Sequence, residues 1–288
     1  MKDDRGAQAA AYLRLLLVRA GDPRSIWAKH ASENRSGEID LVAVAEVLGI
    51  AVESVRAALD GTAVSAGTLQ RFIEAFDLGP RHANRLREIL RGSDSVRVIV
   101  GNELADLRDR SGPPRLETLA VHELHTLGPD GLPAEHQAIQ VIRSTVDELD
   151  AYPYRFDTDE LVVEVVRGGR VGDVYRVNES LFGFDMVLDR PLARDETALM
   201  HYRLTFGYRT APPPEFRRGA LGVMRDVTLW LQFHPERLPA RVWLARWDRL
   251  HHATVIEQQL VELDGEYSAQ ARYGQIEDVI VGFHWEWE

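Results

Sequence analysis

Cysteine is absent from the 288-residue chain, and lysine occurs only at Lys2 and Lys29. The lack of cysteine excludes disulfides, thiolate nucleophiles and metal centres with cysteine ligands. No apolar run approaches the length of a membrane span, and the amino terminus, Met1 to Arg5, lacks the apolar stretch of a signal peptide. We therefore expect a soluble, cytoplasmic protein that has no membrane partner.

An excess of positive charge is also missing, because 45 acidic residues oppose 34 basic ones and the net charge is −11. The two parts of the chain differ: residues 1–92 hold 13 basic and 12 acidic side chains, and residues 93–288 hold 21 and 33. All of the net acidity thus belongs to the second part. Nucleic acid would repel the second part, whereas the nearly neutral first part could approach it.

The residue pattern changes near residue 92. Before it, the spacing of apolar residues predicts helices at about 9–20, 40–48, 52–59, 66–76 and 80–90. Beyond residue 113, β-branched and aromatic residues in short runs predict strands at 119–124, 138–142, 161–166, 173–177, 182–188, 198–208, 227–233, 241–247, 254–261 and 278–287. Only 214–224 reads as helical there.

These elements predict an α+β multidomain chain. We expect an N-terminal all-α helix-turn-helix domain at 1–92 and a linker at 93–114, which includes either a strand at 96–100 or a short helix at 103–110. An all-β sandwich-like domain is expected at 115–288, since many short strands separated by turn signals are typical of sandwiches.

Residues 44–78 carry the functional prediction. Ala45 and Leu48 close one helix before Gly49, which can take a positive φ without a Cβ penalty. Val55 can then lock a second helix onto the first, and Gly61 ends it. This pattern resembles the helix-turn-helix of the lambda-repressor-like (XRE) family. With segments 68–73 and 282–287, the whole chain also resembles regulators of high-GC Gram-positive bacteria that join such a unit to a β-rich C-terminal domain.

The resemblance implies a transcriptional regulator whose second helix enters the major groove of double-stranded DNA. Carried over by position, the DNA-binding residues are Val52, Glu53, Ser54, Arg56, Thr62, Ser65, Thr68 and Arg71, with Ser65 and Thr68 placed to contact phosphate. Further basic side chains that would add affinity are Arg14, Arg19, Arg24, Lys29 and Arg35. The chain departs from the family in a long connection at 22–37 and in a reader helix with a single arginine.

A homodimer is expected, because one short helix reads only a half-site. The β-rich part would pair the two copies, sense a small-molecule effector, or do both. Five of the six tryptophans lie in the last 60 residues, where they can form core, a dimer interface or a pocket for an apolar or aromatic effector.

No catalytic, cofactor or metal motif appears in the β-rich part. His122 and His125 would point to opposite faces of a strand, and Gly168-Gly169 is typical of a hairpin turn. We therefore expect no enzyme activity, no cofactor and no metal. Two other functions stay open. The helical part could bind another protein, which the few basic residues of the reader helix favour, or the β-rich part could hold an unrecognised active site.

Overall fold

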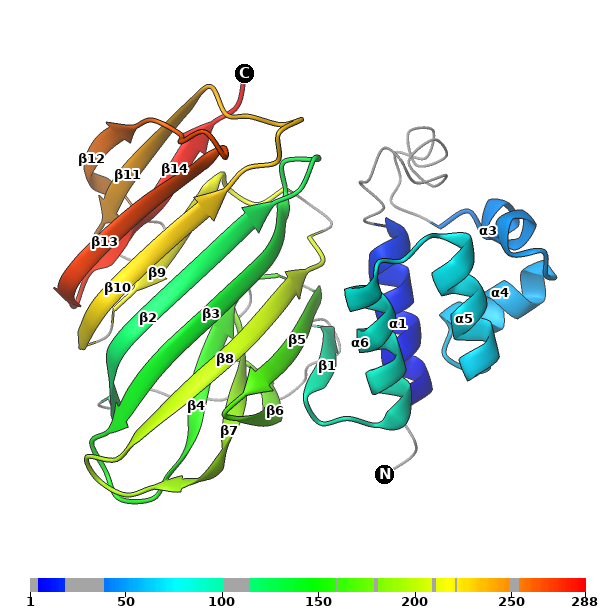
Figure 1. Cartoon of the computed structure of the whole chain (residues 1–288), viewed down its shortest axis with the longest axis horizontal. Helices are drawn as coiled ribbons and strands as arrows, with labels where there is room; N and C mark the ends of the chain where they lie inside the picture. The colour runs from blue at the N-terminus through cyan, green and yellow to red at the C-terminus, as the bar shows by residue number, and fades with distance from the viewer. Residues whose placement is uncertain are drawn as a thin grey trace.

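The computed structural model of the chain describes residues 5–18, 39–100, 114–158, 160–178, 181–208, 211–220, 222–248 and 254–288. Five helices occur in these ranges, and they lie together beside a large β-rich part (Figure 1). They are α1 (Arg5–Val18), α3 (Leu41–Leu48), α4 (Val52–Leu59), α5 (Ala66–Ala75) and α6 (Pro80–Arg91). The last four match the helices that the apolar spacing predicts.

The strands of the described ranges form three sheets. The seven-stranded sheet has the order β1 (Val96–Val100), β5 (Glu160–Arg167), β8 (Thr197–Phe206), β3 (Pro133–Ser144), β2 (Leu116–Leu127), β10 (Val223–Gln232) and β13 (Ser268–Glu277). The four-stranded sheet has the order β12 (Val255–Val261), β11 (Arg241–Trp247), β14 (Ile280–Glu286) and β9 (Glu215–Gly219). The three-stranded sheet has the order β4 (Leu149–Phe156), β7 (Phe182–Leu192) and β6 (Gly169–Arg176).

This architecture corrects the predicted fold class. The protein is mostly β, with 50% strand and 21% helix, and it is not an all-α domain followed by a two-sheet sandwich. Two physical facts explain the difference. Three sheets, and not two, share the interior of the β-rich part, and the helices bury their apolar faces partly against strands. The division of the chain at residue 92 stays a prediction.

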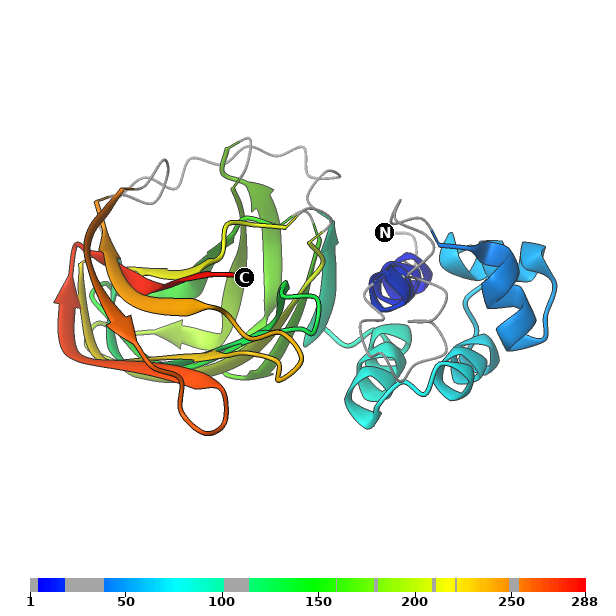
Figure 2. The same ribbon diagram turned by 90° about the horizontal axis from the view of Figure 1, so that it is seen from above.

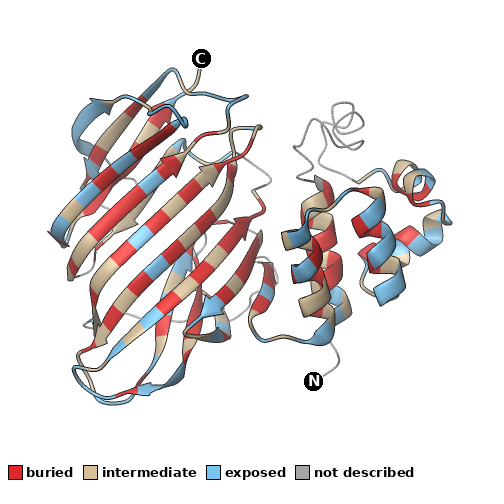
Figure 3. Cartoon of the chain, in the orientation of Figure 1, coloured by how far each residue is buried: buried red, intermediate tan, exposed pale blue. Residues whose placement is uncertain are grey.

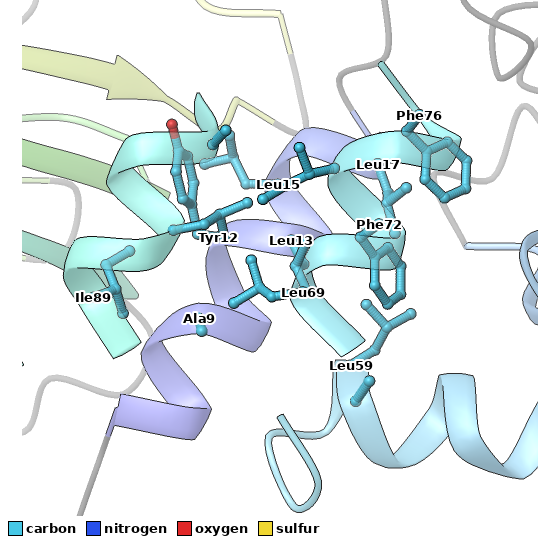
Figure 4. Close-up of a cluster of buried hydrophobic side chains, with 14 of the residues drawn as sticks. Ala9, Tyr12, Leu13, Leu15, Leu17, Leu59, Leu69, Phe72, Phe76 and Ile89 are labelled. Carbon is cyan, nitrogen blue, oxygen red and sulfur yellow. The ribbon is translucent and has the colours of Figure 1, made fainter. Parts of the chain in front are cut away.

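The helices and the edge of the seven-stranded sheet share one hydrophobic core. Val96 and Val98 of β1 and Val162 of β5 belong to the same buried cluster as the apolar side chains of all five helices. Figure 4 shows part of that cluster, in which Tyr12, Leu13 and Leu15 of α1 lie among side chains of the other helices. Seen from above, the helices lie at the β1 side of the β-rich part (Figure 2). The candidate strand at 96–100 is therefore part of the sheet, and the alternative helix at 103–110 lies outside the described residues.

A buried arginine joins α6 to the outer face of this sheet. Arg85 is 1% exposed, and its Nε donates to Glu164 Oε2 of β5 at 2.9 Å. Its Nη1 donates to Thr205 Oγ1 of β8 at 2.8 Å and to the Tyr12 hydroxyl of α1 at 3.4 Å. One guanidinium of α6 thus contacts one other helix and two strands, and beside it Arg81 forms an ion pair with Glu135 of β3.

Strands β2 and β3 alternate buried residues with more exposed ones, as Figure 3 shows. Their inward side chains meet those of the other two sheets in two further apolar clusters. Three predictions about single elements were wrong or incomplete. The segment at 214–224 contains strand β9, because Phe216 is buried against Phe283 of β14. Strand β4 was missed because Pro153 lowers its strand signal, and β13 because its residues are small and polar.

None of the helices in the described ranges is long and apolar enough to cross a membrane.

Replacing Arg85 with methionine should lower the free energy of unfolding by about 3 kcal/mol, because it leaves the partly buried carboxylate of Glu164 without its closest cation. Urea unfolding of the full chain measures the change. Arg91→Met is the control, since Arg91 is exposed at the end of the same helix and should change stability by less than about 1 kcal/mol. Equal effects of the two substitutions would contradict the role of Arg85.

Candidate nucleic-acid interface

A three-residue turn joins α3 to α4. The carboxylate of Asp40 caps the start of α3 and accepts the backbone N–H groups of Val42 at 3.0 Å and Ala43 at 3.1 Å. The helix ends at Gly49, whose φ of 62° and ψ of 38° are left-handed. Glycine takes this conformation without steric cost, which lets the chain reverse direction and enter α4 at once.

One face of α4 is buried and the opposite face is open to solvent. Val55 is fully buried and Leu59 is 3% exposed, so that they hold α4 against the other helices. Glu53, Ser54 and Arg56 are exposed. The predicted base-reading side chains therefore lie on the solvent-facing side of a helix that its apolar face holds in place.

The start of α5 presents backbone N–H groups next to α4. The Ser65 hydroxyl accepts the N–H of Thr68 at 3.0 Å and caps the helix. Leu69 is the first residue of α5 whose N–H forms a backbone hydrogen bond of the helical type, to the Ser65 carbonyl at 2.9 Å. The N–H groups of Ala66 and Gly67 precede it and have no acceptor within the helix, so they can donate to an anion.

A surface hollow of about 600 Å³ lies between α4 and the start of α5. We call it the α4–α5 hollow. It brings together five of the eight predicted DNA-binding residues, namely Glu53, Ser54, Ser65, Thr68 and Arg71. The other three do not line it: Val52 is half-buried, while Arg56 and Thr62 are exposed. The Thr62 hydroxyl donates to the Ala57 carbonyl at 3.1 Å, so it already supports the end of α4.

Of the basic side chains expected to add affinity for DNA, two lie in the described part of the chain. Arg14 donates to the Leu59 carbonyl and so bonds to the last turn of α4. Arg71 is exposed beside the α4–α5 hollow. The remaining four, Arg19, Arg24, Lys29 and Arg35, lie outside the described residues.

Sequence reasoning missed two arginines of α6. Arg87 and Arg91 line a second hollow, of about 490 Å³, between α5 and α6. Arg87 Nη2 donates to the Gln70 side chain at 3.1 Å, which holds it against α5. Their spacing of four residues, which places both on one helix face, was the signal that could have identified them.

Two glycines let α1 pack tightly against the end of α4. A Cβ at Gly61 would lie 2.8 Å from the Ala7 Cα, and one at Gly6 would lie 2.6 Å from the Gly61 carbonyl oxygen. Gly61 also has a φ of 78°, which other residues rarely adopt. The position of α4 thus depends on a close backbone contact that the apolar spacing did not reveal.

A buried polar cluster occupies the interior of the β-rich part. Arg218 Nη1 of β9 donates to Glu123 Oε1 of β2 at 2.6 Å, and both side chains are largely buried. His136 of β3 lies 3.9 Å from the same carboxylate, and the His125 ring stacks on Phe216 at 4.6 Å between centroids. Strand alternation, which places Glu123 on the inward face with His125, was the signal that could have found this cluster.

The sequence predicts that His122 and His125 point to opposite faces of their strand. His122 is exposed and His125 is buried, so the two lie on opposite faces as expected. Burial and, to a smaller extent, the positive charge of Arg218 together lower the pKa of His136 to about 3. Burial also raises the pKa of Glu123, and Arg218 opposes that shift.

Comparison with known proteins gives no family for this chain. No family model matches it, and neither does any curated protein. Among solved structures, it is similar to a putative protease from Parabacteroides distasonis, at 9% identity and a TM-score of 0.40, over 60% of this chain and 41% of that one. Two structures of an M1 zinc metallopeptidase from Deinococcus radiodurans align at 12% and 13% identity, with TM-scores of 0.27 and 0.26.

These two alignments cover 58% and 61% of this chain and 42% and 44% of the metallopeptidase chains. The chain therefore spans about two fifths of the length of the solved structures it matches. At such TM-scores the likenesses carry no argument about function.

Gly61→Ala should lower the free energy of unfolding by about 2 kcal/mol or more, because the new Cβ combines left-handed strain with a clash against α1. Gly67→Ala is the matched control. A Cβ there would meet only the Ser65 hydroxyl at 3.8 Å, and the change within a helix should be neutral or stabilising by up to about 1 kcal/mol. Chemical denaturation compares the two, and similar losses would refute the close packing of α1.

The buried His136 should make the protein less stable in acid. Its pKa is lower in the folded chain than in the unfolded chain, so the unfolded state binds the extra proton as the pH falls below about 6.5. As the pH falls from 6 to 4, the contribution of His136 to the free energy of unfolding should decrease by at most about 1.4 kcal/mol per pH unit. His136→Gln should remove that slope, whereas His122→Gln, at an exposed position, should keep it.

Proposed function

We propose that the protein is a cytoplasmic, DNA-binding transcriptional regulator of the helix-turn-helix type and that it is not an enzyme. The observation that carries the proposal is the α4–α5 hollow, which gathers exposed side chains of α4, the start of α5 at Ser65 and Gly67, and Arg71 on one surface. To read duplex DNA, a protein of this type needs a helix that enters the groove and, beside it, groups that bind the phosphate backbone.

In this proposal α4 contacts base edges and α5 contacts the backbone. Arg56 is the only cation on α4 and would make the base contact with the largest share of specificity. Arg71 and the N–H groups of Ala66 and Gly67 would contact phosphate, which positions the helix without reading sequence. With so few cations, affinity should be modest, and the slope of log affinity against log salt should be shallow.

The β-rich part would pair two copies or bind a small effector. The network of Arg85 gives such an event a physical route to the helices, because Glu164 and Thr205 of the sheet both bond to that guanidinium. A displacement of β5 or β8 would then move α6 and, with it, the shared core of the helices.

Arg56→Ala should weaken binding to a DNA sequence selected by the full chain by about 5- to 150-fold and relax preference at one base position, as expected of a base contact. Arg71→Ala should weaken binding to all sequences alike and reduce the slope of log affinity against log salt by about one. Fluorescence anisotropy at two salt concentrations, on selected and scrambled duplexes, measures both.

Arg272→Ala is the control, because Arg272 is exposed on β13 and pairs with Asp226 at 3.1 Å, away from the helices. It should leave binding unchanged. The proposal fails if the full chain selects no DNA at low salt, or if the three substitutions have equal effects. Failure at low salt would favour the alternative that the helices bind a protein.

A further inference from the structure

The three sheets leave six edge strands in the described ranges: β1, β13, β12, β9, β4 and β6. An exposed edge offers unpaired N–H and C=O groups to any other strand, and proteins usually protect it with charge, proline, short length or a covering element.

Five of the six edges carry such protection. Strand β1 is covered by the helices, whose core includes Val96 and Val98. Strand β4 contains Pro153, and β9 has only five residues, two of which are arginines. Strands β6 and β13 each carry glycine together with charges of both signs.

Strand β12 is the exception. Its sequence is Val-Ile-Glu-Gln-Gln-Leu-Val, and six of its seven residues are exposed. The exposed fractions are 36% for Val255, 59% for Ile256 and 57% for Leu260. In the described part of the chain its one strand neighbour is β11, so its other edge faces away from the sheet.

We propose that β12 pairs with β12 of a second copy of this chain, in an antiparallel register centred on Gln258. The sequence of β12 is nearly the same in both directions. In an antiparallel two-fold contact, each residue of one copy therefore meets a residue of similar character in the other. In that register Ile256 lies opposite Leu260 of the second copy, Val255 lies opposite its Val261, and Glu257 lies opposite its Gln259. Apolar side chains thus meet apolar ones and polar side chains meet polar ones.

Charge also favours a second copy at this edge. The chain has a net charge of −11, so most of its surfaces would repel a copy of itself. The one charged residue of β12, Glu257, is paired with Arg246 Nη1 of β11 at 3.1 Å. The residue on the two-fold axis, Gln258, is neutral, and its Oε1 is 2.8 Å from His284 Nε2. No like charges face each other directly across the contact.

The position of β12 has a consequence for DNA. Both views place β12 on the side of the β-rich part that lies away from the helices (Figures 1 and 2). Two copies joined there hold their helices at opposite ends of the assembly, so they would reach two separated sites and not adjacent half-sites. The pairing itself does not depend on DNA binding, so either proposal can fail alone.

Light scattering after gel filtration at micromolar concentration tests the pairing. The full chain should have twice its monomer mass of 32.5 kDa. The double substitution Ile256→Lys with Leu260→Lys should give a monomer, because four cations would face each other across the edge. Leu199→Lys, at a leucine 43% exposed on β8, is the control and should remain dimeric. A monomeric wild type, or a dimeric double variant, would overturn the proposal.

Disulfide trapping tests the register and does not disturb the apolar contacts. Because the chain has no cysteine, Gln258→Cys introduces the only thiol, on the proposed axis. Mild oxidation should convert most of this variant to a covalent dimer, while Gln270→Cys, exposed on β13, should stay monomeric on a denaturing gel. Equal crosslinking of the two variants, or none at residue 258, would contradict the register.

Discussion

The buried guanidinium of Arg85 is the contact on which the arrangement of the chain depends. It bonds to Glu164 and Thr205 of two strands and to Tyr12 of α1. A buried cation needs partners, so this residue can be accommodated only if α1, α6 and the seven-stranded sheet meet at one place. The shared core around Val96 and Val98 then fills the space beside it. The helices are therefore built onto the sheet edge.

The helical elements could be predicted because their signals are local. Asp40 and Ser65 both act as N-caps, Gly49 takes the left-handed turn, and the apolar spacing defines α3 to α6. The arrangement of the sheets could not be predicted, because it depends on pairs of strands that lie far apart in the sequence. Strand β10 lies parallel to β2, and β9 follows three prolines yet pairs with β14. A single polar residue such as Arg218, which lies in a segment predicted to be helical, is buried only when three sheets meet around it.

The candidate site shows the same division. The eight residues carried over from the family resemblance come from one continuous segment, and the structure places five of them around one hollow. The contacts that hold that segment are longer in range: Gly61 against α1, Arg14 at the last turn of α4, and Arg87 against Gln70. The local sequence pattern indicates which side chains are exposed. The contacts that hold their helices in place depend on packing between residues far apart in the sequence.

In the proposed function, α4 lies in the major groove of duplex DNA. The most direct test of this placement uses Ser54→Cys, which introduces the only thiol of the chain. An iron chelate is attached to that thiol, and the cleavage of a bound, end-labelled duplex is mapped. We predict strand breaks confined to the nucleotides of the selected sequence, and none when the chelate is attached to Gln270→Cys on β13. Cuts spread evenly along the duplex, or identical patterns from both positions, would contradict the claim.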